Sequence, residues 1–385
     1  MESSAEQPAR VPATIPWYIW SSIIAVTSAM TGTHWDIAWH RSIGRDTFWT
    51  PAHIAIYLCG VISGVGCGYL ILSTSLNGAS LLKRVSVKIW GFRGPLGAFI
   101  AAWGGIAMIT SAPFDDWWHG AYGLDVKIMS PPHVLLIAGM VAVEFGTLVL
   151  ILGQMNRAVG KAKEKLDWLF LYVGAMIVVC ICILIFEYTL RIYMHSGYFY
   201  RVVAIAIPGV LAGVAKASGR RWAATTVIGI YSVFLIGCLW ILPLVSAQPK
   251  LGPVYQPVTH LIPPEFPLLL IVPAVALDWF WARSKTWKPW LVAAVSGLIF
   301  VTLFAAVQWP FATFLLSPLS RNWAFGTMYF DYNLPSTSHY VRNVFYGLEK
   351  TTPQFWAEMA MALAAAILTT RIGMGWGDWM RRIRR

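Results

Sequence analysis

Charged residues are scarce in this chain of 385 residues, making up 12% of it, whereas 57% of the residues are apolar. Soluble globular domains carry about 25% charged residues, so the composition excludes a soluble cytosolic enzyme. The sequence also lacks a Walker phosphate loop, a GxGxxG fingerprint, an HExxH zinc motif and the order of a Ser/His/Asp triad. Nothing in it therefore supports those enzyme classes.

Cysteine is rare as well, and no CxxC pair is present. The five cysteines are Cys59, Cys67, Cys180, Cys182 and Cys238. All of them lie inside apolar runs, so we interpret them as small buried residues rather than as a disulfide framework. The first 12 residues lack the basic start and the cleavage site of a signal peptide, so we expect the first apolar run to remain as a helix.

Long apolar runs dominate the rest of the sequence. A helix needs about 20 apolar residues to cross a bilayer, so the runs predict an all-α, polytopic integral membrane protein of about ten transmembrane helices. The expected spans are 16–35, 51–76, 90–112, 131–155, 167–190, 200–215, 222–246, 265–282, 289–316 and 353–372. We expect two regions, a four-helix region at 1–155 and a six-helix region at 156–385 with an outer loop at 317–352.

The net charge of +12 fits membrane topology better than nucleic-acid binding, because Lys and Arg form short clusters between the apolar runs. We therefore expect no nucleic-acid partner. Most of these basic residues fall in alternate connections, so the positive-inside rule places both termini in the cytoplasm and the chain in a plasma (inner) membrane. With this topology all eight His lie on the outer side.

Two segments of the N-terminal region are copies of one pattern. Residues 35–53 read WDIAWHRSIGRDTFWTPAH, and residues 114–133 read FDDWWHGAYGLDVKIMSPPH. The matching pairs are Asp36 with Asp115, Trp39 with Trp118, His40 with His119, Gly44 with Gly123, Asp46 with Asp125, Thr50 with Ser130 and His53 with His133. The region therefore contains a duplicated two-helix unit.

Each copy predicts a three-ligand metal site. The Asp and the first His are four residues apart, so they project from the same face of a helix. The Thr or Ser suits the N-cap of the next helix, with Pro at its first position, which puts the second His in the first turn. A loop then brings one carboxylate and two imidazoles together, with room for water or substrate. The predicted ligands are Asp36, His40 and His53 at one site and Asp115, His119 and His133 at the other.

Duplication of a purely structural capping device is the alternative interpretation. Two further residues, Asp46 and Asp125, either orient a ligand imidazole or cap their loops. Asp116 lies three residues before His119, so it either replaces Asp115 as a ligand or supports the ligands from outside.

Other aromatic and imidazole side chains are secondary candidates. The tryptophans around the two copies form the interfacial belt, which we favour, or wall an apolar substrate pocket. His195, His260 and His339 are candidates for a fourth ligand, although a solvated loop His is the more common finding.

The spacing Asp36-x3-His40-x12-His53, in which His53 ends the phrase RDTFWTPAH, resembles the metal motif in the C subunit of the copper membrane monooxygenases. Members of that family oxidise methane, ammonia and short alkanes. Asp115-x3-His119-x13-His133 is similar to that subunit's second motif, which usually begins with Asn. The resemblance covers about residues 15–155. It implies an integral membrane copper site that faces the outer side, in a three-subunit complex that activates dioxygen.

The chain also departs from that family. Asp115 in place of Asn adds a negative charge, which favours a divalent metal and leaves iron, zinc or manganese open beside copper. The chain is longer than the usual subunit, and its six C-terminal spans match no motif of the family.

The leading hypothesis is a copper-dependent oxidoreductase, or the metal subunit of a monooxygenase-like complex, with one or two copper ions and a small apolar substrate. The alternative is a non-catalytic copper-binding, metal-delivery or structural subunit of a respiratory membrane complex. Expected partners are the lipid bilayer and either other membrane subunits or further copies of this chain. Whether the two sites form one dinuclear centre stays open.

Overall fold

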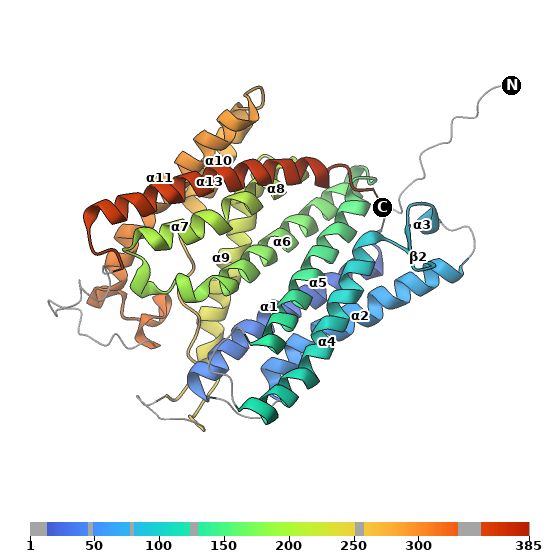
Figure 1. The fold of residues 1–385 in the computed structure, drawn as a ribbon, viewed down its shortest axis with the longest axis horizontal. Helices are drawn as coiled ribbons and strands as arrows, with labels where there is room; N and C mark the ends of the chain where they lie inside the picture. The colour runs from blue at the N-terminus through green and yellow to red at the C-terminus, as the bar shows by residue number, and fades with distance from the viewer. Residues whose placement is uncertain are drawn as a thin grey trace. The chain divides into compact units, whose positions relative to one another are not determined.

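The computed structural model describes residues 14–44, 49–77, 81–123, 130–250, 258–329 and 348–384. Of the residues that the structure describes, 78% are helical, and Figure 1 shows long helices together with one short hairpin. The prediction of an all-α, polytopic membrane protein is confirmed, because eight helices among the described residues are long and apolar enough to cross a membrane.

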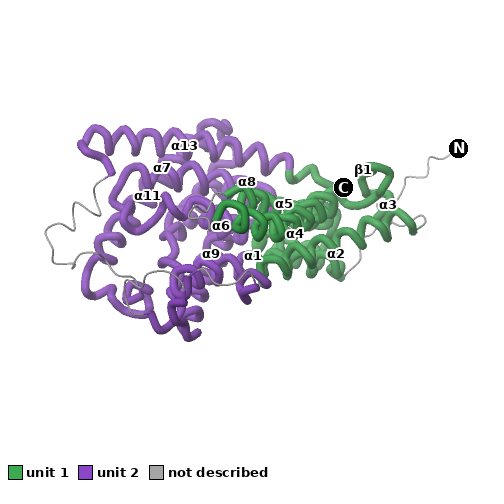
Figure 2. The backbone as a smooth tube through the Cα atoms, turned by 60° about the horizontal axis from the view of Figure 1, so that its bottom comes forward, with its two compact units in different colours: residues 1–29, 55–173, 380–385 green, residues 30–54, 174–379 purple. Residues whose placement is uncertain are grey.

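The chain forms two compact units whose residues alternate along the sequence (Figure 2). Unit 1 comprises residues 1–29, 55–173 and 380–385, and unit 2 comprises residues 30–54 and 174–379. The expected division after residue 155 follows chain order, whereas these units do not. As a result, the two copies of the Asp-His-His pattern belong to different units.

Unit 1 holds most of the N-terminal elements. They are α1 (Trp17–Ser42), α2 (Pro51–Leu76), α3 (Leu81–Arg84), β1 (Val87–Ile89), β2 (Phe92–Gly94), α4 (Leu96–Tyr122), α5 (Pro131–Met155) and α6 (Gly160–Leu184). The end of α1, the start of α2 and the end of α6 count with unit 2. The span expected at 90–112 begins later, at Leu96, because residues 87–94 pair as an antiparallel hairpin.

Unit 2 holds the C-terminal helices and several short 3-10 turns. Its elements are η1 (Phe186–Tyr188), η2 (Arg191–Tyr193), α7 (Gly197–Ala206), α8 (Pro208–Ser218), α9 (Ala223–Ile241), η3 (Leu242–Leu244), α10 (Ile271–Arg283), α11 (Pro289–Leu315), η4 (Pro318–Ser320), η5 (Trp323–Phe325), η6 (Thr327–Tyr329) and α13 (Thr352–Met380). Residues 330–347 of the expected outer loop lie outside the described residues.

Eight of the ten expected spans correspond to candidate membrane helices. They are α2, α4, α5, α6, α7 with α8, α9 with η3, α11 and α13. The spans expected at 16–35 and 265–282 correspond to α1 and α10. With 13 residues α10 is about 20 Å long, which is shorter than a hydrocarbon core of about 30 Å. α1 has 26 residues, but Ser, Thr, His and Asp interrupt its apolar positions.

Glycines let three helices of unit 1 approach one another closely. A Cβ atom on Gly104 of α4 would lie 2.7 Å from the carbonyl oxygen of Gly139 in α5. One on Gly105 would lie 2.7 Å from the carbonyl oxygen of Gly60 in α2, and Figure 1 shows the three helices as neighbours. Small residues favour helix association in lipid because close backbone packing replaces the hydrophobic driving force. This packing fixes α4 and α5, which carry the second ligand set.

A similar glycine contact joins α8 and α13 in unit 2. A Cβ atom on Gly377 of α13 would lie 2.7 Å from the carbonyl oxygen of Gly213 in α8. α8 begins at Pro208, which has no N–H to donate to the Ala204 carbonyl one turn earlier. The hydroxyl of Thr369 in α13 lies 3.2 Å from that carbonyl and 2.9 Å from the Ala365 carbonyl of its own helix. Thus α13 brings a polar group to the break between α7 and α8.

Candidate metal centre

The first ligand cluster lies where α1 ends and α2 begins, within unit 2. α1 continues beyond the expected span to Ser42, so Asp36 and His40 stand one turn apart on the helix itself. The hydroxyl of Thr50 accepts a hydrogen bond from the His53 N–H at 3.1 Å. This is the N-cap contact that the sequence predicts, and it fixes the turn that carries the third ligand.

The three predicted side chains of this cluster meet at one carboxylate oxygen. Asp36 Oδ1 lies 3.1 Å from His53 Nε2 and 3.5 Å from His40 Nε2. One ligand atom from each residue lies within 4.8 Å of the other two. Asp36 Oδ1 is buried and has no aligned hydrogen-bond donor among the described residues. An oxygen that is desolvated in this way is costly unless something else, such as a cation, satisfies it.

The donor set and its spacing fit a metal ion. Metal–nitrogen and metal–oxygen bonds of about 2.0–2.2 Å place tetrahedral ligand atoms about 3.3–3.6 Å apart. Imidazole nitrogens suit copper, zinc and iron, and the carboxylate offsets one positive charge. The His40 side chain is 41% exposed, so an ion held here would retain access for water or a substrate.

The second cluster has the same composition and lies in unit 1. Asp115 Oδ1, near the end of α4, lies 3.3 Å from His119 Nε2 and 3.5 Å from His133 Nε2 of α5. Asp115 Oδ1 and His119 Nε2 are both buried without an aligned hydrogen-bond partner among the described residues. The structure thus brings together all three predicted ligands of this copy as well.

The two clusters differ in the contacts that position their ligands. Ser130 stands at the N-cap position of α5, as the sequence predicts, but its side chain makes no cap hydrogen bond, and its hydroxyl is buried without a partner among the residues that the structure describes. The predicted N-cap position of Ser130 is confirmed, but the side chain forms no cap hydrogen bond there. Pro132 at the second helical position removes one of the N–H groups to which an N-cap oxygen usually bonds. Among the described residues, the group whose three ligand atoms all lie within 4.8 Å of one another is the first cluster.

The remaining candidates fall outside both clusters or outside the described residues. Asp116 is exposed, and Asp115 is the carboxylate that contacts the imidazoles. The ring of His195 contacts Thr313 Oγ1 at 3.0 Å, and that of His260 contacts Thr259 Oγ1 at 2.7 Å. Residues outside the described part are Asp46, Asp125 and His339.

A distant segment that the sequence analysis did not connect with the site holds the end of α1. The Ile262 N–H donates to the Ser42 hydroxyl at 2.6 Å, and the Lys250 N–H donates to the Ile43 carbonyl at 2.9 Å. A buried apolar cluster joins the same parts of unit 2 and consists of Ala38, Ile43, Ala247 and Leu261. Residues more than 200 positions away therefore position the helix end that carries Asp36 and His40.

Arg41, the residue after His40, is held by the same region. Its guanidinium donates to the Pro263 carbonyl at 3.4 Å and lies over the Phe186 ring. Burial lowers the pKa of Arg41; nearby Glu265 opposes that shift, and Arg191 adds to it. Glu265 itself accepts from the Arg191 N–H at 3.2 Å and pairs with the Arg191 side chain at 3.5 Å. The contacts of Arg41 with Pro263 and Phe186 anchor α1 just beyond its second ligand.

The tryptophans around the clusters divide into two groups. Trp35 and Trp39 pack against the buried apolar cluster, and their indole N–H groups are buried without a hydrogen-bond partner among the described residues. Trp49 and Trp117 are exposed, as expected for residues of an interfacial belt. Trp35 and Trp39, each next to a ligand in the sequence, therefore help to pack the end of α1 against the distant segment.

Comparison of the chain with protein-family models, curated proteins and solved structures gives no match. Function is therefore inferred from the two clusters themselves and from the spacing of their ligands.

Proposed function

We propose that both clusters bind a transition metal, with copper at the first, and that this chain is a copper-dependent oxidoreductase or the metal subunit of a monooxygenase-like complex. The observation that carries this proposal is the convergence of Asp36, His40 and His53 within 4.8 Å around a buried carboxylate oxygen that lacks a hydrogen-bond donor. The order and spacing of these ligands are those of the copper-monooxygenase C subunit that the sequence resembles.

The residues of the chain have distinct tasks in this proposal. Asp36 supplies negative charge, and the two imidazoles supply nitrogen donors from separate helices. Copper, when bound, supplies the redox chemistry that activates dioxygen. Trp35 and Trp39 are next to Asp36 and His40 on α1 and pack against the buried apolar cluster, so we assign them to the apolar surroundings that a small apolar substrate would need. The exposed face of the His40 side chain provides the route by which such a substrate would reach the site.

A metal assay on the full-length protein in detergent tests the metal-binding part. After chelation and reloading with Cu²⁺, we expect two copper ions per chain in the original protein. His40→Ala and His119→Ala should each retain one copper ion per chain. His260→Ala is the matched control, since His260 is an exposed imidazole outside both clusters, and it should retain two ions. Full copper content in folded His40→Ala would overturn the first site.

Dioxygen-dependent oxidation of a short alkane by membranes that contain the chain separates catalysis from metal delivery. A monooxygenase loses this activity in His40→Ala. A delivery protein instead has no such activity and passes its copper to an acceptor. The absence of cysteine from both clusters favours catalysis, because carriers of Cu⁺ depend on soft sulfur ligands.

We further propose that both clusters face the outer side of the plasma membrane, with the termini in the cytoplasm, as the distribution of Lys and Arg favours. A membrane-impermeant chelator should then remove copper from sealed right-side-out vesicles and leave it in inside-out vesicles. Removal from inside-out vesicles alone would contradict this orientation.

A further inference from the structure

The hairpin β1–β2 places two cations directly opposite each other. Its register pairs Val87 with Gly94, Lys88 with Arg93 and Ile89 with Phe92. Trp90 and Gly91 form the two-residue turn, and both have positive φ values, 48° and 89°. Such turns match the twist of paired strands, so the register is well specified. Lys88 and Arg93 therefore project from the same face of the hairpin.

This arrangement is unfavourable without an anion. Side chains opposite each other in a strand pair have Cβ atoms about 4.5–5.5 Å apart, and like charges in that position destabilise the pair. Lys88 and Arg93 are both exposed, and within the described ranges neither forms an ion pair with an acidic side chain. A bound anion between them would turn repulsion into attraction.

The tip of the hairpin indicates where that anion comes from. Trp90 is 77% exposed and meets Trp103 of α4 edge to face at 5.2 Å, and Trp103 is itself 51% exposed. Trp103 lies about 10 Å along a candidate membrane helix from its start at Leu96. The hairpin thus folds back along α4 and puts its aromatic tip beside a side chain on the lipid-facing surface. Trp is typical of the membrane–water interface.

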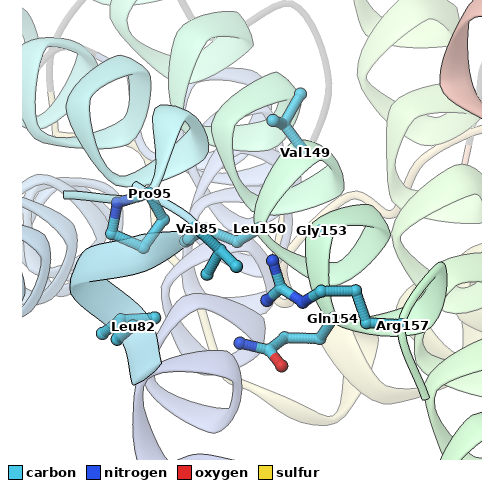
Figure 3. A pocket seen from close by; sticks show the side chains of 8 residues that line it. All are labelled: Leu82, Val85, Pro95, Val149, Leu150, Gly153, Gln154 and Arg157. Atoms are coloured by element: carbon cyan, nitrogen blue, oxygen red, sulfur yellow. The ribbon is translucent and has the colours of Figure 1, made fainter. Parts of the chain in front are cut away.

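A third cation lies at this end of unit 1. Figure 3 shows Arg157 and Gln154 lining a pocket together with apolar side chains that include Leu82, Val85 and Leu150. The guanidinium of Arg157 donates to the Arg384 carbonyl. This end of α2 and α4 is opposite the end that carries His53 and Asp115, so it is separate from the ligand clusters.

We propose that Lys88 and Arg93 bind the phosphate of an anionic phospholipid headgroup, with the lipid's glycerol and acyl chains against Trp90 and Trp103. A phospholipid meets both requirements at once, because its phosphate satisfies the two cations and its apolar part covers the two exposed rings. Basic residues near a membrane surface attract anionic lipids in this way. The site is independent of metal binding.

Native mass spectrometry of the delipidated full-length protein tests this proposal, with titration by phosphatidylglycerol and, in parallel, by phosphatidylcholine. In Lys88→Gln/Arg93→Gln the dissociation constant of the tightest phosphatidylglycerol should rise about 30-fold, or roughly 2 kcal/mol. The matched control is Lys161→Gln/Lys165→Gln, which removes two exposed cations one turn apart on α6. It should bind within threefold of the original protein.

Two further arms make the outcome decisive. Soluble glycerol phosphate at millimolar concentration should leave the bound lipid in place if the acyl chains contribute to binding. Without added lipid, the melting temperature of Lys88→Gln/Arg93→Gln should be unchanged or higher than that of the original protein, because the repulsion between the two cations is removed. The proposal is overturned if the original protein does not prefer phosphatidylglycerol, if the control variant weakens equally, or if glycerol phosphate displaces the lipid. A lower melting temperature without lipid would likewise overturn it.

Discussion

The two copies of the Asp-His-His pattern share their chemistry but not their support. In the first copy a capped α2 and a distant segment of unit 2 hold the ligands, and three donor atoms lie within 4.8 Å of one another. In the second copy, glycine contacts between α4 and α5 hold the ligands, and Ser130 makes no cap contact. Because a preorganised site spends less free energy on ordering its ligands, we expect the first cluster to bind metal more tightly.

The largest expected effect comes from removing the carboxylate on which both imidazoles converge. Asp36→Ala should weaken copper binding at the first site by about 100-fold or more, since the buried oxygen lies 3.1 and 3.5 Å from the two nitrogens. Competition with a chelator of known affinity measures this loss. Asp115→Ala should have the same effect at the second site only. Loss of both ions in either variant would contradict the separate support of the two copies.

Close packing of α4 against α5 should matter for the second copy alone. Gly104→Ala forces a Cβ atom against the Gly139 carbonyl, and overpacking of this kind costs about 1–3 kcal/mol. We expect a lower melting temperature and weaker metal binding at the second site, with the first site unchanged.

Gly68→Ala is the matched control, because a Cβ atom on that α2 glycine meets nothing within 4 Å. It should leave both the melting temperature and metal binding close to their original values. Equal losses in the two variants would mean that α4–α5 packing has no special role.

The anchor of α1 should matter for the first copy alone. Ser42→Ala removes the acceptor of the Ile262 N–H, and loss of one partner of such a hydrogen bond costs about 1–2 kcal/mol. Copper affinity at the first site should fall by up to about tenfold, as read by chelator competition. An unchanged first site, or an equal fall at the second, would argue against a role for the distant segment.

The smallest effect should distinguish the two caps. Thr50→Ala removes an observed N-cap hydrogen bond and should destabilise the start of α2 by about 1 kcal/mol, whereas Ser130→Ala removes none and should change little. Hydrogen exchange at the first turns of α2 and α5 provides the comparison. Faster exchange at α5 in Ser130→Ala would contradict the difference between the two copies.

Local sequence signals were sufficient for the ligands. The i, i+4 spacing of Asp36 and His40 and the Thr-Pro start of the next helix depend on neighbouring residues only, so their convergence with His53 could be predicted. The same reasoning predicted Ser130 at the N-cap of α5, which the structure confirms. The lack of a cap hydrogen bond there could not be predicted, because hydroxyl orientation depends on packing around α5 as well as on position. The apolar runs were sufficient to predict which segments form helices, but not the residues at which those helices begin and end.

Long-range support could not be predicted from the sequence. The contact between Ser42 and Ile262 joins residues 220 positions apart, and no periodicity encodes such a pair. The hairpin at 87–94 was also missed, because its turn and second strand, residues 90–94, adjoin an apolar run and were included in the next expected span. The turn at Trp90 and Gly91 is the signal that was available there.

X-ray absorption spectroscopy of the copper-loaded, full-length protein tests the central claim most directly. If Asp36, His40 and His53 hold copper, the spectrum should show nitrogen and oxygen neighbours at about 2.0 Å together with the outer scattering of two imidazole rings, and the ring signal should fall in His40→Ala. A sulfur neighbour at about 2.3 Å, or an imidazole signal that His40→Ala and His119→Ala both leave unchanged, would contradict the account.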